Sequence, residues 1–117
     1  MAHGDLGVVT QFVEQQPAIV NAAWDWGGGD WETALGAAAH VGRRDIAEYL
    51  LEHGARMDVF AAAMLGEVGI LRAMLEAQPG LRDARGPHGI PLIAHAEAGG
   101  EQASDALELL HVAVAAT

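Results

Sequence analysis

The stretch of sequence that decides the fold is GGDWETALGAAAHVGRRDIAEYLLEHGA, residues 28–55. Alanine and glycine fill positions 34–39 apart from Leu35, and Gly42 follows them. Residues 34–39 predict a short alanine-faced helix, and the residues after Gly42 predict a longer amphipathic one, because its larger side chains recur at helical spacing. These side chains are Ile46, Tyr49, Leu50 and His53. A short helix with so small an apolar face needs neighbours on both sides, so we expect stacked helix pairs.

The same pattern recurs along the chain. A small-residue pair, two further residues and a glycine return at Gly66 and, in degraded form, at Gly99, and Gly4 starts a partial copy. An apolar pair follows each of the four glycines at nearly the same interval: Phe12–Val13, Leu50–Leu51, Met74–Leu75 and Leu109–Leu110. Three of the longer helices are expected to stop at Gln16-Pro17, Gly54 and Gln78-Pro79. Four segments with one internal pattern are typical of a solenoid.

Residues 28–55 resemble one full ankyrin repeat. The resemblance rests on Thr33 and Leu35 of the Thr-Pro-Leu-His turn, on the Ala-Ala-x-x-Gly step, and on the Leu-Leu-x-x-Gly-Ala ending. It is weaker in the other segments, although Pro91-Leu92 carries the turn again in the last one. The resemblance implies an all-α ankyrin-repeat solenoid of about 3.5 helix-turn-helix repeats with short hairpin loops.

The glycine spacing departs from the regular pattern of that family. The intervals between Gly4, Gly42, Gly66 and Gly99 are 38, 24 and 33 residues, and only the last equals the family period. We expect extra residues in the loop 24–29 and no hairpin before the short helix that follows Met57. The single domain 1–117 then divides into a half repeat and three repeats: 1–23, about 24–56, 57–85 and 86–117.

The composition excludes several classes of protein. Six arginines and no lysine face sixteen acidic residues, which gives a net charge of −10. Such a surface repels phosphate groups and anionic lipids, so we expect neither a nucleic-acid partner nor a membrane partner. The chain has no cysteine, hence no disulfide and no thiolate metal ligand. Without a signal peptide or a membrane-spanning apolar run, the expected location is the cytoplasm.

No catalytic motif is present. The sequence lacks a Gly-x-Ser-x-Gly elbow, a His-Glu-x-x-His helix and a phosphate loop ending in lysine, so we expect neither an enzyme nor a cofactor. The histidines form no tight pair in sequence, and three ligands must converge on a zinc ion, so no metal site is expected. His40 and His53 are interpreted as solvated surface residues. Ser104, with Asp105 and Glu108, indicates a helix N-cap.

The tryptophans and two histidines are the candidate binding residues. Trp in a Gly-rich surface loop favours recognition, since exposed Trp is enriched at interface hot spots; alternatively, Trp31 folds down on the helix of Tyr49. His95 replaces an expected alanine and is either hydrogen-bonded to the next helix or lines the concave face. The ankyrin resemblance implies a module that binds a partner protein of basic or mixed surface through its hairpin tips and concave face. The candidate residues are Trp24, Asp25, Trp26, Asp30, Trp31, His88 and His95.

A second hypothesis is a small-molecule or acid–base enzyme site. Its pocket would be lined by tryptophan on one side and by a histidine and a carboxylate on the other: Trp24, Trp26, Trp31, His95 and Glu97. We also expect a homodimer through the N-terminal helix 5–16, because one following repeat covers its apolar stripe only in part. That stripe is Val8, Val9, Phe12 and Val13. The predicted core is Phe12, Leu35, Ile46, Leu50, Ile70, Leu71, Met74, Leu75, Leu92 and Leu110.

Overall fold

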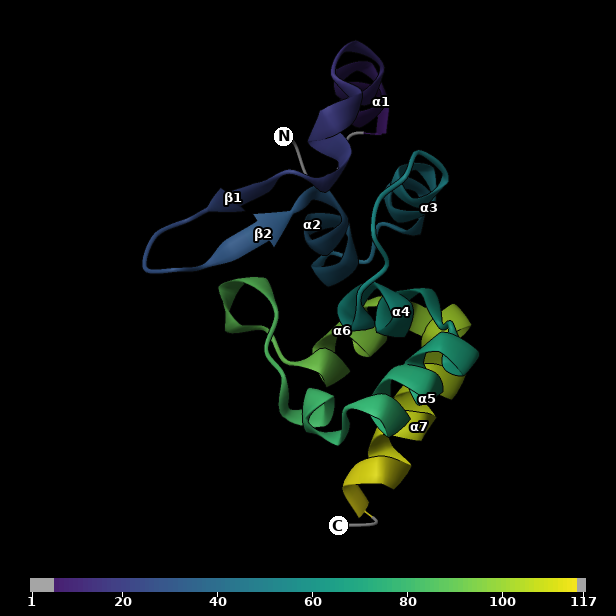
Figure 1. Ribbon diagram of the computed structural model, residues 1–117. Coiled ribbons are helices and arrows are strands. Elements are labelled where there is room, and N and C mark those ends of the chain that lie inside the picture. Colours follow the sequence, from purple (N-terminus) through teal and green to yellow (C-terminus); the bar gives the residue numbers. More distant parts are fainter. Residues whose placement is uncertain (1–5, 116–117) are drawn as a thin grey trace.

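The computed structural model describes residues 6–115. Within this range the protein is mostly helical, with seven α-helices and one two-stranded sheet (Figure 1). The helices are α1 (Leu6–Gln15), α2 (Ala34–His40), α3 (Arg44–Glu52), α4 (Val59–Leu65), α5 (Val68–Ala77), α6 (Leu92–Ala98) and α7 (Ser104–Ala115), and the strands are β1 (Ala23–Asp25) and β2 (Trp31–Thr33). The predicted helical class is confirmed. Gly4 and Asp5, which belong to the first predicted segment, lie outside the described residues.

The ends of the helices follow local sequence signals. The side chains of Thr33 and Asp58 cap α2 and α4, each accepting a hydrogen bond from the backbone N–H three residues further on. Pro17 and Pro79 follow α1 and α5 and begin short 3-10 helices. The 3-10 helices are η1 (Pro17–Asn21), η2 (Pro79–Asp83), η3 (Pro87–Gly89) and η4 (Gly100–Ala103). The N-cap prediction for Ser104 is wrong, because this residue has helical dihedral angles and follows η4 directly.

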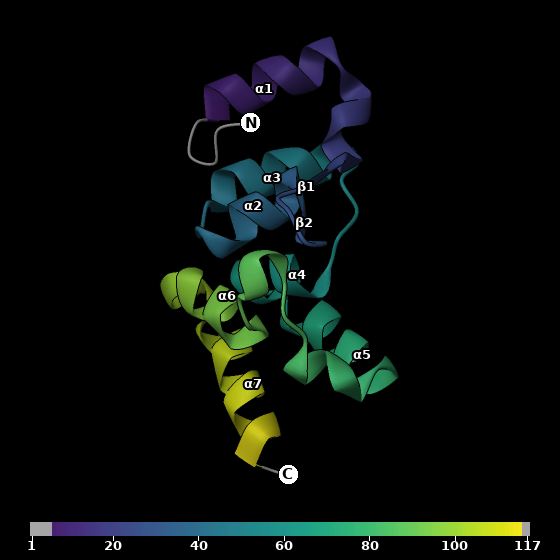
Figure 2. The same cartoon turned by 90° about the vertical axis from the view of Figure 1, so that its left-hand side faces the viewer.

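The short helices form the centre of the molecule. Helix α4 packs on α2 on one side and on α6 on the other, while α1 packs on α3 and α5 packs on α7. Figure 2 shows α1 and α7 at opposite ends of the molecule, with α2 and α4 between them. None of the helices within residues 6–115 is long and apolar enough to cross a bilayer.

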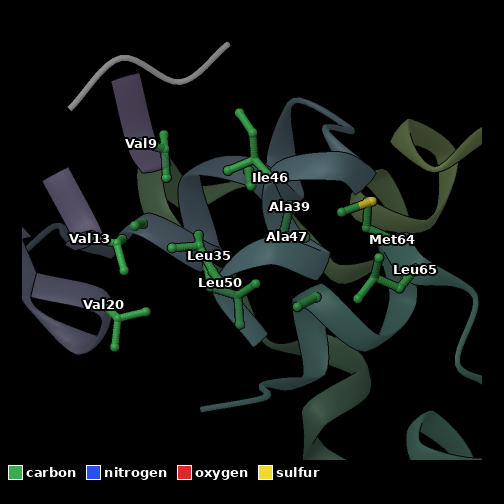
Figure 3. Packing of buried hydrophobic residues seen from close by; sticks show 13 residues of the cluster. Val9, Val13, Val20, Leu35, Ala39, Ile46, Ala47, Leu50, Met64 and Leu65 are labelled. Atoms are coloured by element: carbon green, nitrogen blue, oxygen red, sulfur yellow. The ribbon is translucent and has the colours of Figure 1, made fainter. Parts of the chain in front are cut away.

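Two apolar cores meet at α4. The first joins α1, η1, α2 and α3 to Ala61, Met64 and Leu65 of α4. Figure 3 shows residues of this core, running from Val9 and Val13 past Leu35 and Leu50 to Met64 and Leu65. The second core joins Val59, Ala62 and Ala63 of α4 to α5, α6 and α7. Every α4 side chain except that of Phe60 is buried, so α4 belongs to both cores.

Seven of the ten predicted core residues are buried: Leu35, Ile46, Leu50, Leu71, Leu75, Leu92 and Leu110. The prediction is wrong for Phe12 and Ile70, which are 42% and 38% exposed, and Met74 is only partly buried. The outer helices α1 and α5 bury a narrow i, i+4 pair rather than a broad stripe. Sequence reasoning missed the alanines and Met64 of α4, whose periodicity is hidden because nearly all sides of the helix are covered.

The rest of the chain covers more of the apolar stripe of α1 than the dimer hypothesis assumes. Val9 and Val13 are buried within the chain, and Val8 is partly buried. Of the four stripe residues only Phe12 is exposed. The apolar area that α1 offers to a second copy is therefore smaller than the sequence suggests.

Close backbone approach explains the glycine of the recurring pattern. Gly66 ends α4 with a φ of +75°, a left-handed conformation that side chains with a Cβ rarely adopt. A Cβ at this position would also overlap the carbonyl oxygen of Gln102. Gly42 approaches Ala98 in the same way. The turn after each of these two short helices thus lies directly against a later segment of the chain.

Truncating Leu50 to alanine should lower the free energy of unfolding by about 2–5 kcal/mol, because the Leu50 side chain is fully buried in the first core. Urea denaturation followed by circular dichroism measures this change. Ile70→Ala is the control and should cost about 0.5 kcal/mol or less, as exposed substitutions usually do. Equal losses for the two variants would contradict the burial described above.

Candidate functional site

The tryptophan segment is a tight β-hairpin. Strands β1 and β2 are antiparallel, and in the loop the N–H of Trp26 donates to the carbonyl of Asp30 over 2.8 Å. The Asp25 carboxylate accepts the N–H of Gly27 over 2.8 Å. The three glycines 27–29 have φ values of 114°, 63° and 84°, which explains why this turn needs a run of glycine.

The tryptophans are exposed, as predicted. Trp26 and Trp31 expose 60% and 59% of their surface, and Trp24 is the least exposed of the three. The strand register pairs Trp24 with Glu32 and Asp25 with Trp31. Because side chains alternate along a strand, Trp24 and Glu32 lie on one face of the hairpin and Trp31 lies on the other. One face of the hairpin therefore carries the carboxylate of Glu32, and the other carries the ring of Trp31.

Glu32 is the centre of a polar cluster on the first face. Its side chain is buried, with 3% of the residue exposed, and its Oε2 atom lies 3.0 Å from Nε2 of His40 and 3.2 Å from Nε2 of His88. Its other oxygen accepts the indole N–H of Trp26 over 3.1 Å. We name Glu32, His40 and His88 the Glu32 cluster. It joins strand β2, the end of α2 and the turn η3.

Asp30 fixes the position of His88. The Asp30 carboxylate accepts the backbone N–H of His88 over 2.7 Å, and its second oxygen lies 2.8 Å from ring atom Nδ1. His88 adopts the left-handed φ of 62° in the turn after Pro87. The hairpin is thus attached to a turn 58 residues away in the sequence.

These contacts change the ionisation of both partners. The backbone N–H of His88 holds the pKa of Asp30 below its usual value, and the ring adds to this effect. In turn, the hydrogen bond to Asp30 raises the pKa of His88, and the Glu32 carboxylate acts in the same direction. The contact therefore favours the charged forms of Asp30 and His88.

The Glu32 cluster corrects two expectations. His40 is not a solvated residue, since its side chain is only 13% exposed and faces Glu32. The expectation that no set of metal ligands converges is also wrong, because one ligand atom from each cluster residue lies within 4.8 Å of the others. Glu32 and His40 flank the alanine helix, but no sequence signal connects either of them with His88. His53, by contrast, is exposed and stacks on Tyr49, as a surface residue would.

A hollow of about 350 Å³ lies beside the hairpin. It opens between the hairpin, the start of α4 and the segment before α6: Gly29, Asp30, Trp31, Thr33, Gly36, Asp58, Phe60, Arg85, Gly86 and Pro87. Burial raises the pKa of Asp58, although the backbone N–H groups of Ala61 and Phe60 favour its ionised form. Of the five residues predicted to line a pocket, only Trp31 lines this hollow. Trp24, Trp26, His95 and the exposed Glu97 do not.

His95 lies inside the protein. It is fully buried, its Nδ1–H donates to the carbonyl of Pro91 over 2.9 Å, and its ring centre lies 4.7 Å from that of Phe60. The hydrogen bond stays within the start of its own helix rather than crossing to the next one. A partner cannot contact a side chain with no exposed surface, so His95 is removed from the candidate binding residues.

The remaining candidate binding residues lie together. The hairpin carries Trp24, Asp25, Trp26, Asp30 and Trp31, and His88 joins them through its contact with Asp30. The centres of the Trp26 and His88 rings lie 5.9 Å apart.

Comparison of the chain with family models, curated proteins and solved structures gave no match in any of the three.

The stability of the protein should depend on pH through His95. Burial lowers the pKa of this ring, His40 acts in the same direction, and Pro91 and Asp58 oppose them. Below about pH 6.5 the unfolded chain therefore takes up a proton that the folded chain excludes, and the folded state loses stability as the pH falls. The loss is at most about 1.4 kcal/mol per pH unit.

Urea titrations between pH 7.5 and pH 5.5, in the presence of a chelator, measure this dependence. The variant His95→Leu should show a smaller fall in unfolding free energy than the wild type, because the variant has no ring to protonate. The contributions of histidines that do not interact with His95 cancel in the comparison. Parallel curves for the two proteins would contradict the assignment.

Proposed function

We propose that the chain is a short ankyrin-type solenoid that binds a partner protein through its tryptophan hairpin. Three helix pairs support the repeat architecture: α2 with α3, α4 with α5, and α6 with α7. The short helix of each pair packs centrally, and a hairpin precedes α2 as the ankyrin pattern requires. The repeats 24–56, 57–85 and 86–117 each contain one pair.

Of the segments that precede the three short helices, only the one before α2 forms a two-stranded hairpin within the described residues. Residues 54–58 form no strand before α4, and only a single bridge between Arg85 and Pro91 precedes α6. The tryptophan hairpin therefore projects without an equivalent hairpin beside it, and the hollow lies next to it. The contact surface that this arrangement favours is the hairpin β1–β2 together with the hollow beside it.

One observation carries the proposal: two tryptophans are about 60% exposed on a hairpin that is held in place. Trp31 and Trp26 offer large, stiff rings whose burial costs little conformational entropy. The bonds from Trp26 to Glu32 and from Asp30 to His88 order the hairpin before a partner arrives. A preordered surface loses less entropy on binding than a flexible loop does.

The charge of the surface indicates a basic partner. The chain has a net charge of −10, and the hollow is lined by two acidic residues, Asp30 and Asp58, and two aromatic ones, Trp31 and Phe60, with Arg85 as its one basic residue. A lysine or arginine side chain of the partner would find both a carboxylate and an aromatic face there. We therefore assign the hollow to a cationic side chain in a basic segment of the partner protein.

Selection from a random peptide library displayed on phage tests the proposal. Peptides enriched in lysine or arginine should bind the wild type, and Trp31→Ala should weaken that binding at least about 30-fold, as loss of a hot spot does. The free energy of unfolding of this variant should change by about 0.5 kcal/mol or less, because the side chain is exposed.

Val112→Ala provides the matched control, since Val112 is an equally exposed apolar residue on α7, far from the hairpin. It should leave the affinity of the selected peptides unchanged. Failure to enrich any basic peptide would contradict the proposal. Equal losses for the two variants would contradict it as well.

A further inference from the structure

We propose that the Glu32 cluster binds a divalent transition-metal ion of the Zn²⁺ class. The cluster offers two imidazole nitrogens and one carboxylate oxygen, a ligand set that zinc sites use when they keep a fourth position open. This site lies beside the proposed binding surface and contacts it through Trp26, whose indole N–H donates to Glu32.

The distances within the cluster suit tetrahedral coordination. With metal–ligand bonds of about 2.0–2.2 Å, neighbouring ligand atoms of a tetrahedral zinc ion lie about 3.3 Å apart. Oε2 of Glu32 lies 3.0 Å from Nε2 of His40 and 3.2 Å from Nε2 of His88. All three ligand atoms lie within 4.8 Å of one another, so small side-chain rotations are enough to place them around one ion.

The outer contacts of two ligands match those of zinc sites. A histidine ligand usually donates its second ring N–H to a carboxylate, which fixes the ring and its tautomer. Asp30 holds Nδ1 of His88 at 2.8 Å in this way and leaves Nε2 directed at Glu32. The indole N–H of Trp26 orients Glu32 through its other oxygen. Both ligands are therefore positioned before an ion arrives.

The charge and exposure of the cluster also fit a divalent ion. The carboxylates of Glu32 and Asp30 together balance two positive charges. An ion that binds displaces the proton that Asp30 otherwise favours on His88, so both imidazoles ligate in the neutral form. Glu32 and His40 are shielded from solvent, and His88 lies at the surface. The exposed side provides a route for entry and a fourth position for water. Magnesium and calcium prefer all-oxygen sites, so they should not compete.

Calorimetric titration of the chelator-treated, metal-free protein with Zn²⁺ tests the proposal. We expect one Zn²⁺ per chain, with a change in tryptophan fluorescence because Trp26 contacts Glu32. Mg²⁺ at the same concentration should give no such response. Absence of a saturable Zn²⁺ response, or an equal response to Mg²⁺, would overturn the proposal.

Variants separate this site from adventitious binding to histidine. His88→Asn should weaken Zn²⁺ binding more than about 100-fold, and asparagine tolerates the left-handed backbone at this position. Asp30→Asn, which alters only the outer contact, should weaken binding about 10–100-fold. His53→Asn is the matched control at an exposed histidine outside the cluster, and it should bind as the wild type does.

Circular dichroism shows whether each variant keeps its helical content. If His88→Asn does not fold, the comparison of Asp30→Asn with His53→Asn decides, because Asp30 is only half-buried and His53 is exposed. Wild-type affinity in Asp30→Asn, or an equal loss in His53→Asn, would overturn the proposal.

Discussion

The close approach of the short helices α2, α4 and α6 is the constraint on which the rest of the structure depends. Helix α4 lies between α2 and α6 and contributes buried side chains to both apolar cores. Its alanines 61–63 have no exposed surface, so the neighbouring helices pack directly on them. Space is just as limited at the ends of α4 and α6, where a Cβ at Gly66 or Gly99 would overlap the backbone of a neighbouring segment. Side-chain size, more than apolar area, determines whether the helix pairs can stack.

The polar site is a consequence of this stacking. Because no hairpin separates α3 from α4, the turn η3 lies close to the hairpin β1–β2, and His88 reaches Asp30. The same approach brings His88 to Glu32 on one side and encloses the hollow on the other. The proposed binding surface and the proposed metal site therefore share the hairpin. Trp31 lies on the face away from Glu32, whereas Trp26 contacts Glu32 and Asp30 contacts His88. A metal ion at the Glu32 cluster would fasten the hairpin to η3 by a second link besides Asp30.

The sequence predicts the local features of the structure well, because their causes are local. The short alanine helices, the stops at Gln16-Pro17 and Gln78-Pro79, and the exposed tryptophan segment follow from adjacent residues. The exposure of Phe12 and Ile70 could not be predicted from helical spacing, since spacing defines a stripe but not how much of it a neighbour covers. The Glu32 cluster could not be predicted from the sequence. It depends on the contact between Asp30 and His88, which are 58 residues apart and are brought together only by the stacking of the helices. For the same reason, the burial of His95 against Phe60 does not follow from the residues next to it in the sequence.

Hydrogen–deuterium exchange on Ala63→Leu tests the central claim most directly, with Ala73→Leu as the control on the exposed side of α5. A leucine at position 63 has no space within the second core and should displace α4. Since α4 belongs to both cores, backbone amides of α2 and α3 should lose protection together with those of α6 and α7, while the control keeps wild-type protection. Loss of protection confined to α6 and α7, with α2 and α3 unchanged, would show that α4 does not couple the two cores.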